Sequence, residues 1–509
     1  MPEPSREFEL KFDLTGAELS RLARNPKLKS NGPRAPRALR SVYFDTPDFR
    51  LHAKGISFRV RSDGPAYIQT IKLDTRLKHG LSTPVEIEDH LESPNPDITR
   101  IHDRRVRRKV AKAVKGSSLT KAFEMFVTRT THRINARGSI IEIALDKGET
   151  LALDRRSEIC EAELELIKGH PRDLLQIAQV LFAKSSVRLS PASKAERGFR
   201  LILKSRPAQK IEPVRAAAPA IHRGQTGGEA FAEILRSSRE QIVKNRSVVL
   251  ETGEAEGAHQ LRVGLTRLRS AERALRALLN SPQLSQLEAE AQTLARAVGR
   301  LRDADVLIDT IYAPVAGDPP RKAGFDELRD ALRAHRAAMQ AEARAALTSE
   351  AWSRLLLSLT LWPAMLERDP SLQKPVEKYA GKLLQKPWKR SAKLGHSIAT
   401  MAGERRHKMR KSLKKLRYTV EFLAPLYHSP DVKAFVKQLK KLQDVFGYVN
   451  DVRMAGQLSD IATEYGGEHP APLFAAGFVL GHHGAKAAEV WDEAPKAWHR
   501  LKASGLFWK

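Results

Sequence analysis

Cysteine is nearly absent from this chain of 509 residues, which holds Cys160 as its one thiol. An internal disulfide framework and a cysteine-based zinc site are therefore excluded within one chain. Aromatic side chains make up 6% of the residues, which leaves little material for a platform that stacks bases. We therefore do not expect nucleic acid to be the partner.

Long apolar runs are also missing. The most apolar stretch, residues 355–366, is shorter than the roughly 20 residues that a membrane-spanning helix needs. The first residues contain no apolar signal segment. We expect a cytoplasmic protein that makes no contact with a membrane.

Acidic residues are the scarcer charged type. The chain has 88 Lys and Arg residues against 59 Asp and Glu residues, a formal net charge of +29 and a pI of about 10.2. With 41% hydrophobic residues, it still has enough apolar material for folded cores. Such an excess favours a polyanionic partner: nucleic acid, an anionic membrane surface or polyphosphate. Charge alone does not choose among them.

The N-terminal residues alternate between charged and apolar side chains. In Glu7-Phe8-Glu9-Leu10-Lys11 the three charged residues share one face of an extended strand. Taken alone, such a strand is most simply the wet face of an antiparallel sheet. Later segments repeat the alternation, with the charges sorted by sign. Some carry carboxylates on one face, at Glu86 and Glu88, at Glu142 and Asp146, and at Glu161, Glu163 and Glu165; others carry cations, at Arg59 and Arg61, at Lys72, and at Arg129 and Arg133.

A solvated sheet face does not require this sorting, but a closed barrel with a charged interior does. Carboxylates on one wall would hold divalent cations, and basic groups on the other would hold phosphate. The apolar faces would then point outward beneath covering helices, for which residues 15–25, 101–113 and 171–184 are the candidates.

Taken in order, these motifs resemble a CYTH domain of the triphosphate tunnel metalloenzyme superfamily. The resemblance covers residues 5–205. It rests on Glu7, Glu9 and Lys11, the turn at Tyr43-Phe44-Asp45-Thr46, Arg59 and Arg61, Lys72, Glu86 and Glu88, the acidic strand ending at Glu165, and the closing stretch with Lys194 and Arg197.

The resemblance implies an eight-stranded antiparallel tunnel that binds inorganic triphosphate and Mg²⁺ or Mn²⁺. The implied metal ligands are Glu7, Glu9, Glu161 and Glu163, with Glu86, Glu88, Glu142 and Asp146 at a second metal site or orienting water. The implied substrate-binding residues are Lys11, Arg59, Arg61, Lys72, Arg129, Arg133 and Lys194, and the expected catalytic group is Glu7, Glu9, Lys11, Glu161 and Glu163.

A segment rich in proline, alanine and glycine, residues 206–225, reads as a linker. Beyond it the pattern is helical and repeats. His259 and His407 head similar segments and lie 148 positions apart, as do Gly299 and Gly447. Two motifs repeated at one offset indicate a duplicated helical unit, with repeats at about 226–365 and 366–509.

Each repeat has a helix with a basic stripe beside an apolar one. The stripes are His259, Arg262, Thr266 and Arg269 in the first copy and His407, Arg410, Lys414 and Arg417 in the second. A solvated face and metal ligation by the histidines remain as alternatives. Thr266 interrupts the basic pattern, so we expect weaker binding by the first copy.

The second half resembles a CHAD domain, the conserved-histidine α-helical domain, over residues 226–509. This resemblance implies a duplicated four-helix bundle whose basic groove binds inorganic polyphosphate. The residues implied to bind it are His259, Arg262, Arg269, His407, Arg410, Lys414 and Arg417.

We thus expect a multi-domain protein, α+β in residues 1–205 and all-α in residues 226–509. The expected activity is a metal-dependent inorganic triphosphatase with a polyphosphate-binding helical domain. Two alternatives stay open. One is a non-catalytic or weakly active polyphosphate-binding protein targeted to polyphosphate granules. The other is an organic triphosphate hydrolase or adenylate cyclase.

Overall fold

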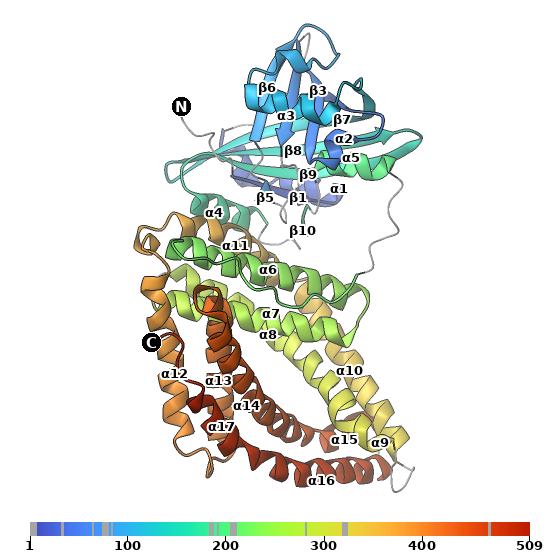
Figure 1. Cartoon of the computed structure of the whole chain (residues 1–509). Helices are drawn as coiled ribbons and strands as arrows, with labels where there is room; N and C mark the ends of the chain where they lie inside the picture. Colours follow the sequence, from blue (N-terminus) through green and yellow to red (C-terminus); the bar gives the residue numbers. More distant parts are fainter. Residues whose placement is uncertain are drawn as a thin grey trace. The chain divides into compact units, whose positions relative to one another are not determined.

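The computed structural model describes residues 8–31, 35–63, 66–73, 81–82, 85–182, 188–190, 193–203, 211–279, 282–317, 324–466 and 470–509. The chain divides into two compact units, Met1–Lys210 and Ile211–Lys509. Strands dominate the first unit and helices make up the second (Figure 1).

The described part of the first unit contains one ten-stranded antiparallel sheet. Its order is β10-β1-β9-β8-β7-β2-β3-β4-β6, and β5 pairs with β1. β5 thus pairs next to one end of the sheet, and β6, the strand that follows it in the chain, lies at the other end. The long strands are β1 (Phe8–Asp13), β2 (Arg37–Asp45), β3 (Ile56–Asp63), β4 (Ala66–Leu73), β6 (Val85–Leu91), β7 (Thr120–Ala136), β8 (Ser139–Ala152) and β9 (Arg155–Lys168). Two strands have two residues each, β5 (Leu81–Ser82) and β10 (Arg188–Leu189). The expected eight-stranded antiparallel sheet is confirmed, with two short additions.

Part of the outer face of the barrel is apolar and is covered by helices. On β3 and β4, Phe58 and Ile71 are buried and alternate with charged residues on the opposite face. They pack under α3 (Arg104–Val114). The sheet also contacts α1 (Gly16–Ala23), whose N-cap Thr15 forms a capping box with Glu18, and α4 (Pro171–Leu181), which begins with a proline at its first turn. Shorter elements are η1 (Pro26–Asn31), α2 (Arg50–Ala53) and η2 (Ile98–Arg100).

One end of the inner face is filled by α5 (Lys194–Ile202). Ala195 and Phe199 pack against buried side chains of β2, β7, β8 and β9. Gly198 allows this close approach, because a Cβ atom there would lie 2.1 Å from the ring of Phe123. The packing holds the first residue of α5, Lys194, at the charged part of the interior.

The second unit is all-helical. Its elements are α6 (Gly227–Glu251), α7 (Ala255–Arg276), α8 (Pro282–Val306), η3 (Leu307–Tyr312), α9 (Ala313–Ala316), α10 (Phe325–Leu347), α11 (Glu350–Glu367), η4 (Pro370–Leu372), α12 (Glu377–Gly395), α13 (Gly403–Leu423), η5 (Ala424–Leu426), α14 (Ser429–Ala455), α15 (Leu458–Gly466), α16 (Ala471–Trp491) and α17 (Glu493–Ala503). η3 is a single π-helical turn. No helix among the described residues is long and apolar enough to cross a bilayer.

Helices α6, α7, α8 and α11 pack together, as do α12, α13, α14 and α17 (Figure 1). The starts of α7 and α13, Ala255 and Gly403, are separated by the same 148 positions as the two histidines. In the first bundle Gly228 brings α6 close to α11, because a Cβ atom there would lie 2.2 Å from the carbonyl oxygen of Leu366. The duplicated bundle is confirmed.

The described part of the expected linker, residues 211–225, lies against the helical unit. The Asn245 side chain accepts a hydrogen bond from the Val214 backbone N–H and donates one to its carbonyl oxygen. The Ala217 carbonyl oxygen accepts hydrogen bonds from Ser237 and Arg267. Residues 211–225 are therefore bound to the surface of the helical bundle.

Candidate functional sites

Three buried carboxylates meet inside the barrel. Asp146 on β8 lies directly opposite Glu161 on β9, and Glu163 lies one pleat further along the same face. The three are 0%, 1% and 8% exposed. A ligand oxygen from each falls within 4.8 Å of the others. Strand alternation thus produces a compact acidic cluster.

Cations surround this cluster. Lys11 Nζ lies 2.7 Å from Glu163 and 2.8 Å from Glu9. Arg129 donates two bonds of 2.7 Å to Asp146 and one of 2.7 Å to Glu163. Lys194 reaches Asp146 at 2.8 Å and Glu163 at 2.7 Å, and it also pairs with Glu161. Acids and bases from β1, β7, β8, β9 and α5 form one network.

The charges in this network keep one another ionised. Burial alone would raise the pKa of Glu163, but Lys11, Lys194 and Arg129 outweigh it and hold that pKa well below its usual value. Burial alone would lower the pKa of Lys194, but Asp146 and Glu163 raise it. The pKa of Lys11 is raised in the same way, against burial, by Glu163 and Glu9. The network is therefore a set of mutually neutralised ions.

A second charged cluster lies on β3, β4 and β6. Glu86 pairs with Lys72 at 2.5 Å and with Arg59 at 3.4 Å, and Glu88 lies 3.9 Å from Arg59. Burial alone would raise the pKa of Glu86, but Lys72, Arg59 and, more weakly, Lys11 lower it. Because Lys11 belongs to β1, its influence on Glu86 places the two clusters across one interior.

Arg61 differs from its neighbours. No ion pair involves it among the residues that the structure describes, and its Nε donates a 3.4 Å hydrogen bond to Ser41. The charge of Arg59, burial and the charge of Arg129 lower its pKa to about 10, which leaves the guanidinium protonated at neutral pH. Arg61 is therefore an interior cation available to an anionic ligand.

Most of the sequence-predicted residues of the first unit lie on the inner face. Asp146, grouped by sequence with a second metal site, lies with Glu161 and Glu163. Glu142 lies further along β8 and accepts a 3.1 Å hydrogen bond from Arg133. Glu7 lies outside the described residues.

The sequence interpretation did not assign a site role to Asp13. It continues the alternation of Glu9 and Lys11 and lies directly opposite Glu161. Its carboxylate accepts a 3.3 Å bond from Arg197, which also pairs with Glu161. The period of two along β1 was the signal that could have found it.

The acidic cluster suits a divalent cation in its chemistry. Carboxylate oxygens are the ligands that Mg²⁺ and Mn²⁺ prefer, and such ions are commonly shared between carboxylates and phosphate oxygens. Each carboxylate here also contacts an ammonium or guanidinium group. The donor set fits a metal once these ion pairs open.

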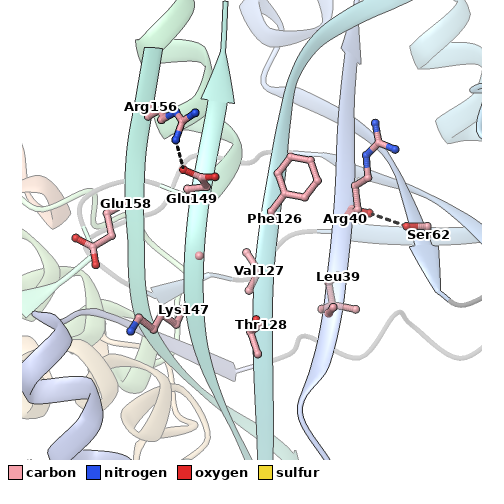
Figure 2. Close-up of a pocket in the computed structure, with 12 residues that line it drawn as sticks. Leu39, Arg40, Ser62, Phe126, Val127, Thr128, Lys147, Glu149, Arg156 and Glu158 are labelled. Carbon is pink, nitrogen blue, oxygen red and sulfur yellow. Dashed lines mark hydrogen bonds and ion pairs between the residues drawn. The ribbon is translucent and has the colours of Figure 1, made fainter. Parts of the chain in front are cut away.

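A separate groove of about 630 Å³ lies on the other face of the sheet. Its lining includes Phe126, Lys147 and Glu158, whose side chains alternate with those of the interior residues (Figure 2). Glu149 is paired with Arg156 at 3.8 Å. The groove contains none of the predicted site residues.

In the helical unit the two basic stripes lie on α7 and α13, which contact each other (Figure 1). Arg262 is paired with Asp303 at 2.5 Å. By contrast, Arg410 and Lys414 form no ion pair among the described residues, and Arg410 Nε is buried with no hydrogen-bond partner there. Cations of both stripes therefore lie where the two pseudo-equivalent helices meet.

The pKa values show how closely these cations lie. Burial and the charges of Arg410 and Arg262 lower the pKa of Lys414 to about 7, although Asp451 and Asp303 oppose the shift. Burial lowers the pKa of Arg410, and Arg262 contributes. Because Arg262 belongs to α7 and the other two to α13, the two copies contribute to one basic site.

The remaining stripe residues are arranged differently. Burial and neighbouring cations lower the pKa values of His259, His407 and Arg269. Arg417 instead donates a 2.6 Å bond to Glu421. Thr266 donates to the Arg262 carbonyl oxygen at 2.8 Å. Of the predicted stripe, Arg262, Arg410 and Lys414 form its charged centre.

The fold and its sites define a two-part protein: a barrel with an acidic and basic interior, and a duplicated helical unit with a basic centre. A family model described as CYTH domain matches residues 5–199, and one described as CHAD domain matches residues 233–460. The chain joins a CYTH domain to a CHAD domain.

Individual relatives agree with this assignment. The chain is 28% identical over 167 residues to the inorganic triphosphatase of Haemophilus influenzae, a match that covers 32% of this chain and 46% of that protein. It therefore spans about half the length of that relative. The chain is also similar to the crystal structure of the CHAD domain from the plant Ricinus communis, with 29% identity, a TM-score of 0.51, and coverage of 57% of this chain and 96% of that one.

Proposed function

We propose that the first unit is a metal-dependent inorganic triphosphatase, which releases phosphate from triphosphate and leaves pyrophosphate. The observation that carries the proposal is the buried cluster of Asp146, Glu161 and Glu163 on the inner face that also presents Lys11, Arg129 and Lys194. The relative named inorganic triphosphatase supports the choice of substrate.

The basic residues of the barrel would bind and orient the substrate. A triphosphate is a dense polyanion, and guanidinium groups match its oxygens through paired hydrogen bonds. Arg61 can take a phosphate oxygen without giving up an ion pair, whereas Lys11 and Lys194 would first leave Glu163. Cations held in place around the transferring group offset the charge that develops on it.

Asp146, Glu161 and Glu163 would hold the divalent ion, with Glu9 adjoining them through Lys11. When bound, the ion would supply Lewis-acid stabilisation of a phosphoryl oxygen. Asp146 and Glu163 suit this role because neighbouring cations hold their pKa values below the usual range and keep them ionised at neutral pH. The closed end formed by α5 would keep bulk water from that side of the site.

The test is phosphate release by the full chain from triphosphate, long-chain polyphosphate, ATP and thiamine triphosphate, with Mg²⁺ or Mn²⁺ supplied and with each withheld. Release from triphosphate that depends on the metal supports the proposal. Preference for ATP or thiamine triphosphate would transfer the assignment to the organic triphosphate alternative. If no phosphate is released from any of the four substrates, the proposal that the first unit is an enzyme is overturned.

We propose further that the helical unit binds inorganic polyphosphate at the centre formed by Arg262, Arg410 and Lys414. Arg410 and Lys414 form no ion pair among the described residues, although Asp451 and Asp303 lie near enough to act on both, so a phosphate chain can bind them without breaking an ion pair. Such binding would retain the protein on polyphosphate, including polyphosphate granules. It is tested by measuring the salt dependence of polyphosphate affinity.

A binding-only protein is the second candidate, and one observation favours it. Lys11, Arg129 and Lys194 are already neutralised by carboxylates, which weakens the attraction of the barrel for an anion. If the protein only binds, the wild-type chain binds polyphosphate tightly and releases no phosphate from any of the four substrates tested above.

A further inference from the structure

Helix α3 carries a basic surface that the proposed function does not use. Between Asp103 and Glu124 the sequence has no acidic residue, and its cations gather on α3. Arg104, Arg105, Arg108, Lys109, Lys112 and, just beyond the helix, Lys115 are all exposed. None of these six forms an ion pair in the part of the chain that the structure describes.

The position of α3 separates this surface from the barrel interior. Val106 and Val110 pack on the outer face of the sheet, against residues of β3 and β4. The inner face of those strands carries Arg59 and Lys72. Because the apolar side of α3 is buried, only its charged side meets solvent.

The charge arrangement on α3 works against the helix itself. Arg104 and Arg105 occupy its first turn, where the helix dipole favours anions, and that turn has no acidic residue. Arg104 and Arg108, and likewise Arg105 and Lys109, are like charges four positions apart, which repel each other on a helix surface. A helix that keeps six exposed cations with only partial local compensation, from its N-cap Asp103, points to a role in binding.

The nearby carboxylates compensate only part of this charge: Asp103 caps α3, and the charge of Arg105 is among the causes that lower its pKa. Asp103 accepts hydrogen bonds from the backbone of Arg105 and Val106 and so caps α3. Asp97 accepts from the Thr99 backbone in the same way. Asp89 contacts His102 at 2.6 Å. The nearest acids are thus already engaged with other groups.

We propose that the exposed face of α3 is a second binding surface for inorganic polyphosphate, separate from both the barrel interior and the helical unit. A phosphate chain repeats its negative charge along its length and so matches a row of cations about three turns long. The exposed face has no aromatic residue on which a base could stack and no apolar residue that could enter a membrane. A bare polyphosphate is therefore favoured over nucleic acid or a lipid surface.

The test compares two variants of the full chain that lose the same charge. One replaces Arg104, Arg105, Arg108 and Lys109 by Gln, a residue that keeps helix propensity. The control replaces four exposed cations elsewhere in the first unit by Gln: Arg21, Arg24, Lys168 and Arg172. Both are made also in an Arg262→Ala, Arg410→Ala background, so that the helical unit does not mask the result.

We expect the α3 variant to bind long-chain polyphosphate about five- to tenfold more weakly, with a shallower dependence on salt, while the control changes by less than about twofold. Replacing Arg104, Arg105 and Arg108 by Lys should keep the affinity. Triphosphate hydrolysis, if present in the wild type, should persist in the α3 variant, so the two proposals fail separately. Equal losses in both Gln variants would overturn the proposal. The proposal would also be overturned if the α3 variant lost affinity only for a single-stranded oligonucleotide or for phosphatidylserine vesicles.

Discussion

The two units hold their cations in opposite ways. Inside the barrel, Lys11, Arg129 and Lys194 each contact at least one buried carboxylate. At the centre of the helical unit, Arg410 and Lys414 form no ion pair among the described residues. One site is internally neutralised and the other retains a positive field.

This difference predicts which kind of ligand each site favours. Removing one partner of a buried ion pair leaves a costly unpaired charge, on the order of 3–5 kcal/mol. A ligand that enters the barrel separates these ion pairs, so the freed carboxylates and the freed basic groups both need new partners. A metal ion for the carboxylates together with a polyanion for the basic groups meets this need. At the helical centre, Arg410 and Lys414 can bind an anion without giving up an ion pair, although Arg262 is paired with Asp303. Their attraction for an anion is long-ranged and weakened by salt.

The largest effect should follow from changing the barrel cluster at Glu163. Glu163→Gln keeps the shape but removes the charge that holds Lys11, Arg129 and Lys194 and that would bind the metal. We expect phosphate release from triphosphate to fall about 100- to 1000-fold. The initial rate at saturating triphosphate and Mn²⁺ measures it.

The matched control is Glu158→Gln, on the same strand but lining the outer groove. It should keep the wild-type rate. Circular dichroism melting of both variants separates loss of function from loss of fold. Equal activity in the wild type and Glu163→Gln would remove Glu163 from the site.

Much of this arrangement follows from sequence alone. The alternation in Glu9-Leu10-Lys11 and the sorting of charges between strands predict both the barrel and its charged interior, because side-chain direction in a strand has a strict period of two. The repeat of His259 and His407 predicts the duplicated bundle because the repeats share one spacing.

Pairing between strands could not be predicted in the same way. That Asp146 lies with Glu161 depends on the register between β8 and β9, which sequence periodicity does not fix. Nor does a helical stripe show which of its members are neutralised. Arg417 and Arg410 look equivalent in the pattern, yet only Arg417 contacts a carboxylate, at Glu421. Tertiary contacts decide that difference.

The second prediction uses this pair within the helical unit. Arg410→Ala together with Lys414→Ala should weaken polyphosphate binding by about 30-fold, because two unpaired cations are lost. Arg417→Ala should change it by less than about threefold, because Glu421 already neutralises Arg417. Isothermal titration at fixed salt measures both. A larger loss of polyphosphate affinity in Arg417→Ala than in the double variant would contradict this prediction.

The third prediction concerns coupling in the barrel. A non-hydrolysable imido analogue of triphosphate should draw Lys11 and Lys194 away from Glu163 and so free its oxygens for a metal. We expect Mn²⁺ to bind about tenfold more tightly with the analogue present, and the analogue to gain equally from Mn²⁺. Titration calorimetry in both orders measures this without catalysis. If the affinity for Mn²⁺ and the affinity for the analogue do not depend on each other, the ion pairs of Glu163 do not have to open for binding.

The smallest effect should be a pH dependence of the helical site. The pKa of Lys414 is about 7 in the free protein, since burial, Arg410 and Arg262 lower it. A bound polyanion favours the protonated amine, so binding takes up a proton, and the affinity should fall as pH rises from 6 to 8, by at most about tenfold. Burial and neighbouring cations lower the pKa values of His259 and His407 below their usual range, and a long polyphosphate titrates only at its ends. Lys414→Met should flatten the profile, whereas Arg417→Ala should keep it. An unchanged slope in Lys414→Met would show that another group takes up the proton.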